Sequence, residues 1–118
     1  MKVYVSRRSV AAGDDLDAPH KREFSFRDGT SLKEVLATIQ KSYLPRIEGG
    51  NATWSVTSNI PVAVLAQQWA EPRLLVQLGD LTDLETKQGV LRLYFNYHAQ
   101  IDPQLVYDVF WGFQLNAI

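Results

Sequence analysis

Residues 28–45 have the sequence DGTSLKEVLATIQKSYLP, and this stretch decides the fold. Ser31 and Glu34 have the spacing of a capping box, in which the serine accepts from a free backbone N–H and the glutamate reaches back to the cap. Apolar residues then recur every three or four positions: Leu32, Val35, Leu36, Ile39 and Tyr43. This period predicts an amphipathic helix over 32–43 that covers a sheet and stops at Pro45.

Segments with alternating apolar residues flank this helix on both sides, and alternation is typical of strands. The expected strands are Lys2–Ser9, His20–Arg27, Ala52–Thr57, Val62–Trp69, a segment containing Leu74, Val76 and Leu78, and Val90–His98. The polar segment Asp80–Lys87 predicts a short helix or a 3₁₀ turn. Asp102 and Pro103 open a last helix, because Asp is a good N-cap and Pro suits the first helical position. We therefore predict an α+β fold: a mixed sheet of about five or six strands covered by one helix, plus a C-terminal helix.

The composition is that of one globular domain over residues 1–118. The chain carries 12 Lys and Arg against 13 Asp and Glu, with a net charge of -1, and it has no Cys. The absence of Cys excludes disulfides, thiol catalysis, iron–sulfur clusters and Cys-based zinc sites. Asp14, Asp15 and Asp17 form an acidic cluster, but Ser25 and Phe26 stand where a calcium loop would require Glu. We expect no metal and no cofactor.

The charge balance and the hydropathy also bear on partners and location. A near-neutral chain lacks the basic surplus of a nucleic-acid binder. No run of about 18 apolar residues is present, so no membrane span is expected. Residues 1–12 have no apolar core of the kind found in a signal peptide. We expect a cytoplasmic protein.

The two histidines, His20 and His98, are the candidates for acid–base chemistry, because the histidine pKa lies near neutrality. Each lies beside a predicted strand end, outside any recognisable catalytic motif. No nucleophile elbow and no phosphate-binding glycine loop occurs. We therefore predict no catalytic residue. A small hydrolase or isomerase that uses either histidine with a nearby carboxylate is the alternative hypothesis.

The order of elements resembles the β-grasp fold of ubiquitin-like proteins. The matching features are the two N-terminal strands, the helix entry Asp28–Leu32, and the polar segment Asp80–Lys87 before the strand Val90–Tyr97. Ubiquitin-like modifiers need a C-terminal Gly-Gly, whereas this chain ends in Asn116, Ala117 and Ile118, and ferredoxin-type members need Cys. The resemblance therefore implies the adaptor and binding uses of the fold.

The last helix has two apolar faces. With Leu105 at 0° and steps of about 100°, one predicted core-facing stripe falls between about 40° and 140° and contains Val106, Val109, Phe110 and Phe113. A second apolar face falls between about 200° and 280° and contains Tyr107, Trp111 and Leu115. A helix that is apolar on both sides is either buried twice or meets a partner, and Tyr and Trp are enriched at binding hot spots.

The C-terminal half of the chain is more acidic and more aromatic than the N-terminal half. Residues 60–118 carry six Asp and Glu against three Lys and Arg, and they hold eight of the 13 aromatic residues. We predict a partner-binding surface made of Tyr107, Trp111, Leu115, Asp80, Asp83 and Glu85. The expected function is a non-enzymatic protein-binding module, similar in general character to the small immunity proteins with which bacteria neutralise toxin domains. A homodimer through the same helix and a phage or mobile-element structural protein are further alternatives.

Overall fold

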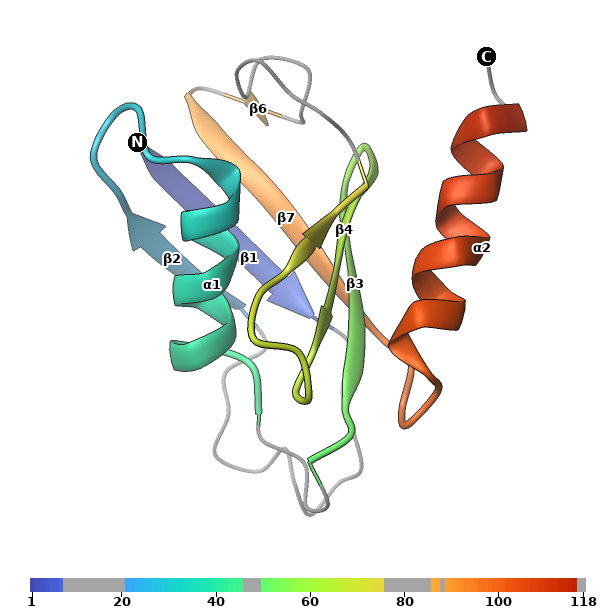
Figure 1. Ribbon diagram of the computed structural model, residues 1–118. Helices are drawn as coiled ribbons and strands as arrows, with labels where there is room; N and C mark the ends of the chain where they lie inside the picture. Colours follow the sequence, from blue (N-terminus) through green and yellow to red (C-terminus); the bar gives the residue numbers. More distant parts are fainter. Residues whose placement is uncertain (8–20, 46–49, 76–85, 88, 117–118) are drawn as a thin grey trace.

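The computed structural model describes residues 1–7, 21–45, 50–75, 86–87 and 89–116 (Figure 1). The elements, in chain order, are β1 (Lys2–Arg7), β2 (Lys21–Ser25), α1 (Leu32–Ser42), β3 (Thr53–Ser58), β4 (Ile60–Ala66), β5 (Arg73–Leu74), β6 (Thr86–Lys87), β7 (Val90–Tyr97) and α2 (Pro103–Asn116). The predicted α+β fold, with a sheet and a C-terminal helix, is confirmed.

Seven strands in the described residues form one mixed sheet, ordered β2-β1-β7-β3-β4-β5, with β6 paired to β7 outside this path. The central pair β1 and β7 is parallel, and Tyr4 lies opposite Arg92 in its register. The remaining pairs are antiparallel. The sheet therefore brings the N-terminal strand beside the last one, although 82 or more residues separate them in the chain.

Helix α1 forms where its local sequence predicts. The Ser31 hydroxyl accepts a hydrogen bond from the Glu34 backbone N–H at 3.2 Å, which satisfies one of the free donors of the first turn. The predicted stripe is buried against the sheet: Leu32, Val35, Leu36, Ile39 and Tyr43. They pack on a core that includes Val3, Val56 and Phe95.

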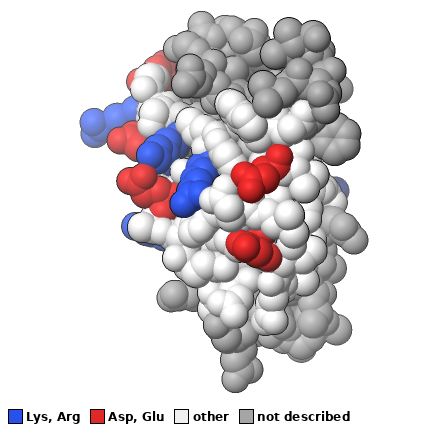
Figure 2. All heavy atoms as spheres, turned by 45° about the vertical axis from the view of Figure 1, so that its right-hand side comes forward, with Lys and Arg blue, Asp and Glu red and all other residues white. Residues whose placement is uncertain are grey.

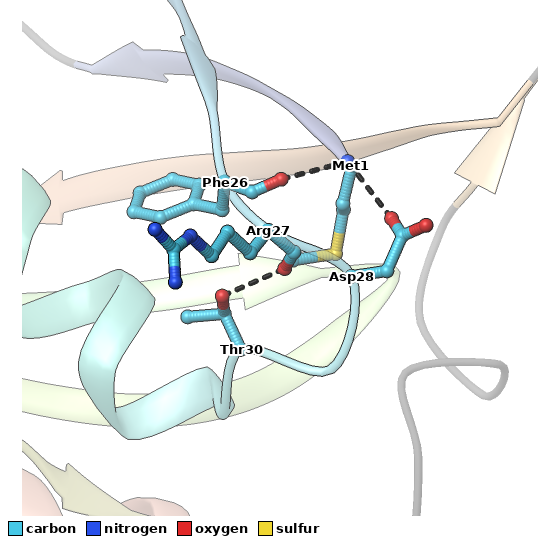
Figure 3. A network of polar contacts seen from close by, with 5 residues as sticks. All are labelled: Met1, Phe26, Arg27, Asp28 and Thr30. Carbon is cyan, nitrogen blue, oxygen red and sulfur yellow. Dashed lines mark hydrogen bonds and ion pairs between the residues drawn. The ribbon is translucent and has the colours of Figure 1, made fainter.

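The turn that leads into α1 is held by backbone and side-chain hydrogen bonds (Figure 3). Thr30 donates to the Arg27 carbonyl oxygen from its backbone N–H at 3.1 Å and from its hydroxyl at 2.7 Å. The Met1 ammonium group donates to the Phe26 carbonyl oxygen at 2.8 Å and to Asp28 Oδ1 at 3.1 Å. These contacts fasten the start of β1 to the chain that follows β2.

Helices α1 and α2 cover opposite faces of the sheet (Figure 1). Neighbouring residues of β4 show this, because Leu65 packs in the α1 core whereas Val64 packs with Val106 of α2. Strand β3 is consequently buried on both faces, including Thr53 and Ser55, which have polar side chains. The Thr53 hydroxyl is satisfied by donating to the Ile101 carbonyl oxygen at 2.7 Å.

Two sequence predictions differ from the structure or lie beyond it. The segment Asp80–Lys87 was predicted to be a short helix or a turn, but its last two residues form β6, since they pair with β7. Residues 80–85 lie outside the described residues, as do Val76, Leu78 and the acidic cluster within 11–19. Neither helix of the described chain has the length and apolar character needed to cross a bilayer.

Candidate functional site

Helix α2 begins as its sequence predicts. Asp102 Oδ1 accepts from the Gln104 backbone N–H at 3.0 Å, and the Asp102 carbonyl oxygen accepts from the Val106 N–H at 3.2 Å. Pro103 stands at the first helical position, where a backbone N–H would have no partner within the helix. The cap fixes where the helix starts, and so which residues share each face.

The inward face of α2 consists of Pro103, Val106, Tyr107 and Phe110. Val106 is 7% exposed and forms a small core with Val64 and Leu75. Tyr107 and Phe110 are half-buried against this core. The Tyr107 hydroxyl donates to the Leu74 carbonyl oxygen of β5 at 3.2 Å. The Phe110 ring lies edge-on to the His98 ring, with centroids 6.1 Å apart. The helix is therefore held at both sides, by β5 and by the end of β7.

These contacts correct the predicted orientation of the helix. Val109 was predicted to face the core, but its side chain is 50% exposed. Tyr107 was predicted to lie on the outer face, but it is half-buried and hydrogen-bonded to the sheet. The helix is rotated by about 60° from the expected orientation. In the observed orientation the Tyr107 ring packs against the sheet and its hydroxyl has a backbone acceptor, which is the usual environment of a partly buried tyrosine.

Four large apolar side chains are exposed on α2 and on the segment just before it. Their exposed fractions lie between 44% and 55%, and they are Ile101, Leu105, Val109 and Trp111. Leu105 and Val109 stand one helical turn apart, whereas Trp111 lies about 120° around the helix from Leu105. The Trp111 ring stacks on the Tyr107 ring, with centroids 6.2 Å apart and planes 9° apart. We call these four residues the α2 surface.

Trp111, one of the six predicted partner-binding residues, thus belongs to the α2 surface, and Tyr107 supports it from beneath. The side chain of Leu115 lies outside the described part of the structure, as do Asp80, Asp83 and Glu85. Ile101, Leu105 and Val109 were absent from the predicted site. The exposure of Val109 follows from the rotation of the helix, which the apolar pattern alone did not indicate; Leu105 lay outside both predicted apolar faces, and Ile101 precedes the helix.

Two aspartates and one arginine, Arg73, lie next to the α2 surface. Asp102 and Asp108 are exposed, and α2 contains no Lys or Arg. Gln104 links this edge to the sheet: its Nε2 donates to Asp108 Oδ1 at 2.9 Å, and its Oε1 accepts from Arg73. Figure 2, which brings the α2 side forward, shows a mostly uncharged described surface, with basic and acidic side chains grouped toward its left and two separate acidic side chains near its middle.

His98 is half-buried and lies at the end of β7. Its Nε2 is 2.7 Å from the Ser55 hydroxyl oxygen. A serine beside a histidine is the arrangement of a nucleophile and its base. However, Ser55 is fully buried between β3 neighbours and the start of α2, so a substrate has no access to its hydroxyl. The contact joins β3 to the end of β7, and His20 lies outside the described residues.

A cavity of about 440 Å³ lies beside the C-terminal end of α1, between Trp54, Trp69 and Lys41. The side-chain amides of Gln40 and Gln67, which line the cavity, form hydrogen bonds with backbone groups. Gln40 Nε2 donates to the Ala66 carbonyl oxygen at 3.1 Å, and Gln67 Oε1 accepts from the Ala52 N–H at 3.4 Å. Gln40 therefore connects α1 to the end of β4, and Gln67 connects the residue after β4 to the residue before β3. In the described residues, no three His, Asp or Glu side chains gather as a metal site would require.

Comparisons of this chain with known proteins do not assign it to a family. The chain matches no family model, no curated protein and no solved structure.

Proposed function

We propose that this chain is a non-enzymatic protein-binding module and that the α2 surface is its binding site. The observation that carries the proposal is the exposure of three large apolar side chains on α2, namely Leu105, Val109 and Trp111, with a fourth, Ile101, two residues before the helix begins. Single exposed apolar residues are ordinary, but several of them on one helix favour an interaction site.

The residue types of the α2 surface suit a helix that docks against another protein. Leu105 and Val109, one turn apart, supply aliphatic contact area that is 55% and 50% exposed. Trp111 adds a large ring, and Tyr107 beneath it restrains that ring by stacking. A ring that is already restrained loses less side-chain entropy on binding, which favours its use as an anchor.

The partner class we propose is a bacterial toxin domain, so that the chain acts as a cytoplasmic immunity protein. The exposed acidic residues Asp102 and Asp108 support this, because they complement a basic partner surface and speed association with it. The parallel pairing of β1 with β7, and α1 across one face of the sheet, support the further proposal of a β-grasp-like adaptor. A second copy of this chain is the alternative occupant of the α2 surface.

The test is co-expression in a bacterial host with the product of the adjacent gene. We expect that product to be toxic, and wild-type protein to relieve the toxicity and to copurify with it. The variant Leu105→Gln/Val109→Gln should do neither, although both positions are exposed and the fold should persist. Ile60→Gln is the matched control, because Ile60 is an exposed apolar residue of β4 outside the α2 surface.

Two outcomes would contradict the proposal. A double variant that still copurifies and protects would exclude the α2 surface as the binding site. The proposal also fails if wild type and double variant both sediment as monomers and neither forms a complex with the adjacent product. That result would exclude both the toxin domain and a second copy of this chain as partners.

A further inference from the structure

The face of the sheet that carries α2 also carries a polar cavity over β1, β7 and the end of β3. The cavity has a volume of about 250 Å³. Six polar side chains line it: Tyr4, Ser6, Thr57, Asn59, Arg92 and Tyr94. We call it the Arg92 pocket.

The strand register builds the Arg92 pocket. In the parallel pairing of β1 with β7, Tyr4 lies opposite Arg92 and Ser6 lies opposite Tyr94. In the antiparallel pairing of β3 with β7, Thr57 lies opposite Tyr94. Because side chains alternate between the faces of a sheet, all five project to the same side, away from the α1 core. The pocket is therefore fixed by backbone pairing.

Arg92 is the cation of this pocket. It is half-buried, and its guanidinium carbon lies 5.1 Å from the centroid of the Tyr4 ring. Its Nε is buried without a hydrogen-bond partner, and no carboxylate of the described chain pairs with it. Arg22 and Arg73 differ from Arg92, because Arg22, which lies over Phe24 at 4.6 Å, donates to the Ser42 carbonyl oxygen, and Arg73 donates to Gln104. The Nε of Arg7 is also buried without a hydrogen-bond partner, but Arg7 does not line this cavity.

The acidic residue in register with Tyr4 already has a partner. Glu23 lies opposite Tyr4 in the pairing of β1 with β2, and its Oε1 is 3.5 Å from Lys2 Nζ. Among the described residues, Arg92 therefore presents a half-buried guanidinium whose Nε has no acceptor. A bound oxyanion would supply both the acceptor atoms and the opposite charge.

We propose that the Arg92 pocket binds an oxyanion, namely the carboxylate or phosphate group of a small molecule. The guanidinium presents donors in a planar fork that matches both groups. Ser6 and Tyr94 line the same cavity and have hydroxyl groups that can act as additional donors, whereas the Thr57 hydroxyl donates to the Tyr94 carbonyl oxygen at 3.5 Å. The cavity is smaller than the roughly 300–1,000 Å³ of pockets for larger ligands, so it accommodates a single ionised group. This site is independent of the α2 surface.

The test is an NMR titration of the folded chain with sodium phosphate and, separately, with sodium acetate, at constant ionic strength. We expect saturable shifts of the backbone amides of Ser6, Thr57, Arg92 and Tyr94 with at least one anion. The anion that saturates at the lower concentration identifies phosphate or carboxylate as the preferred group. Arg92→Gln should weaken binding by about tenfold or more.

The controls separate recognition from folding. Tyr94→Phe keeps the charge and removes one donor, so it should weaken binding by about two- to tenfold even if Arg92→Gln does not fold. Arg22→Gln removes an arginine with similar ring geometry outside the pocket and should leave binding unchanged. The proposal is overturned if neither anion gives saturable shifts, or if Tyr94→Phe and folded Arg92→Gln both bind like wild type.

Discussion

The Tyr107 hydroxyl donates a hydrogen bond to the Leu74 carbonyl oxygen at 3.2 Å, and this contact sets which face of α2 meets the sheet. With Tyr107 turned inward, Leu105 and Val109 project outward and are half exposed. In the same bond, the carbonyl oxygen of Leu74, the last residue of the short strand β5, accepts a hydrogen bond from the helix. The α2 surface is therefore a consequence of how Tyr107 is satisfied.

The first prediction concerns this bond. Tyr107→Phe should lower the free energy of unfolding by about 0.5–1.5 kcal/mol, the usual net contribution of one hydrogen bond. Tyr94→Phe is the control, because Tyr94 is 39% exposed, and its effect should stay within about 0.5 kcal/mol. Urea denaturation measures both. Equal, negligible losses would mean that the Tyr107 hydroxyl does not orient the helix.

The second prediction concerns the core beneath α1. Leu36 is fully buried, so Leu36→Ala should cost about 2–5 kcal/mol through lost burial and the cavity left behind. Leu105→Ala makes the same chemical change on the α2 surface and should cost less than about 1 kcal/mol. Similar losses for the two variants in urea denaturation would contradict the assigned burial.

Helix α1 could be predicted from sequence because its signals are local. The Ser31 cap and the stripe from Leu32 to Tyr43 lie within four turns of each other, and one face is clearly apolar. The orientation of α2 could not be predicted in this way. Its apolar residues extend around most of the helix, so the buried face is defined by tertiary contacts, such as the hydrogen bond of Tyr107 to Leu74, 33 residues earlier in the chain.

The Arg92 pocket, like the orientation of α2, could not be predicted from local sequence patterns. Alternation along Lys2–Arg7 and Val90–Tyr97 places Tyr4 with Ser6, and Arg92 with Tyr94, on one face of each strand. What brings the two pairs together is the parallel register of β1 with β7, a long-range pairing. Local periodicity specifies which residues share a face, but not which strand lies beside them.

The third prediction addresses the hydrolase alternative. Because Ser55 is fully buried, a serine-directed sulfonyl fluoride should leave it unmodified in the folded protein. Mass spectrometry of the treated protein checks this, and an adduct on Ser55 would favour a catalytic Ser55–His98 pair. Ser55→Ala should instead lower the free energy of unfolding by about 0.5–1.5 kcal/mol, because the contact with His98 is lost.

The fourth prediction concerns pH. The hydrogen bond and the positive charge of Lys33, whose Nζ lies 2.8 Å from Glu71 Oε2, hold the pKa of Glu71 below its ordinary value. The pair therefore contributes stability above the unfolded-state pKa, and this contribution is lost as the pH falls through the lower folded-state pKa. The contribution should be small, since both side chains are exposed.

An NMR titration of the Glu71 carboxyl carbon measures this pKa directly. Lys33→Met should raise the pKa of Glu71 toward its ordinary value, because both lowering causes come from Lys33. Lys41→Met, at the other end of α1, is the control and should leave the titration unchanged. An unchanged Glu71 pKa in Lys33→Met would show that the ion pair does not form in solution.

The central claim is that the α2 surface binds another protein, and its most direct test is the affinity of Leu105→Gln/Val109→Gln for the purified partner. Calorimetry should show binding weakened by at least about 2 kcal/mol relative to wild type, on the order of thirtyfold. The free energy of unfolding should stay within about 1 kcal/mol of wild type, because both side chains are exposed. Unchanged affinity in a folded double variant would contradict the claim.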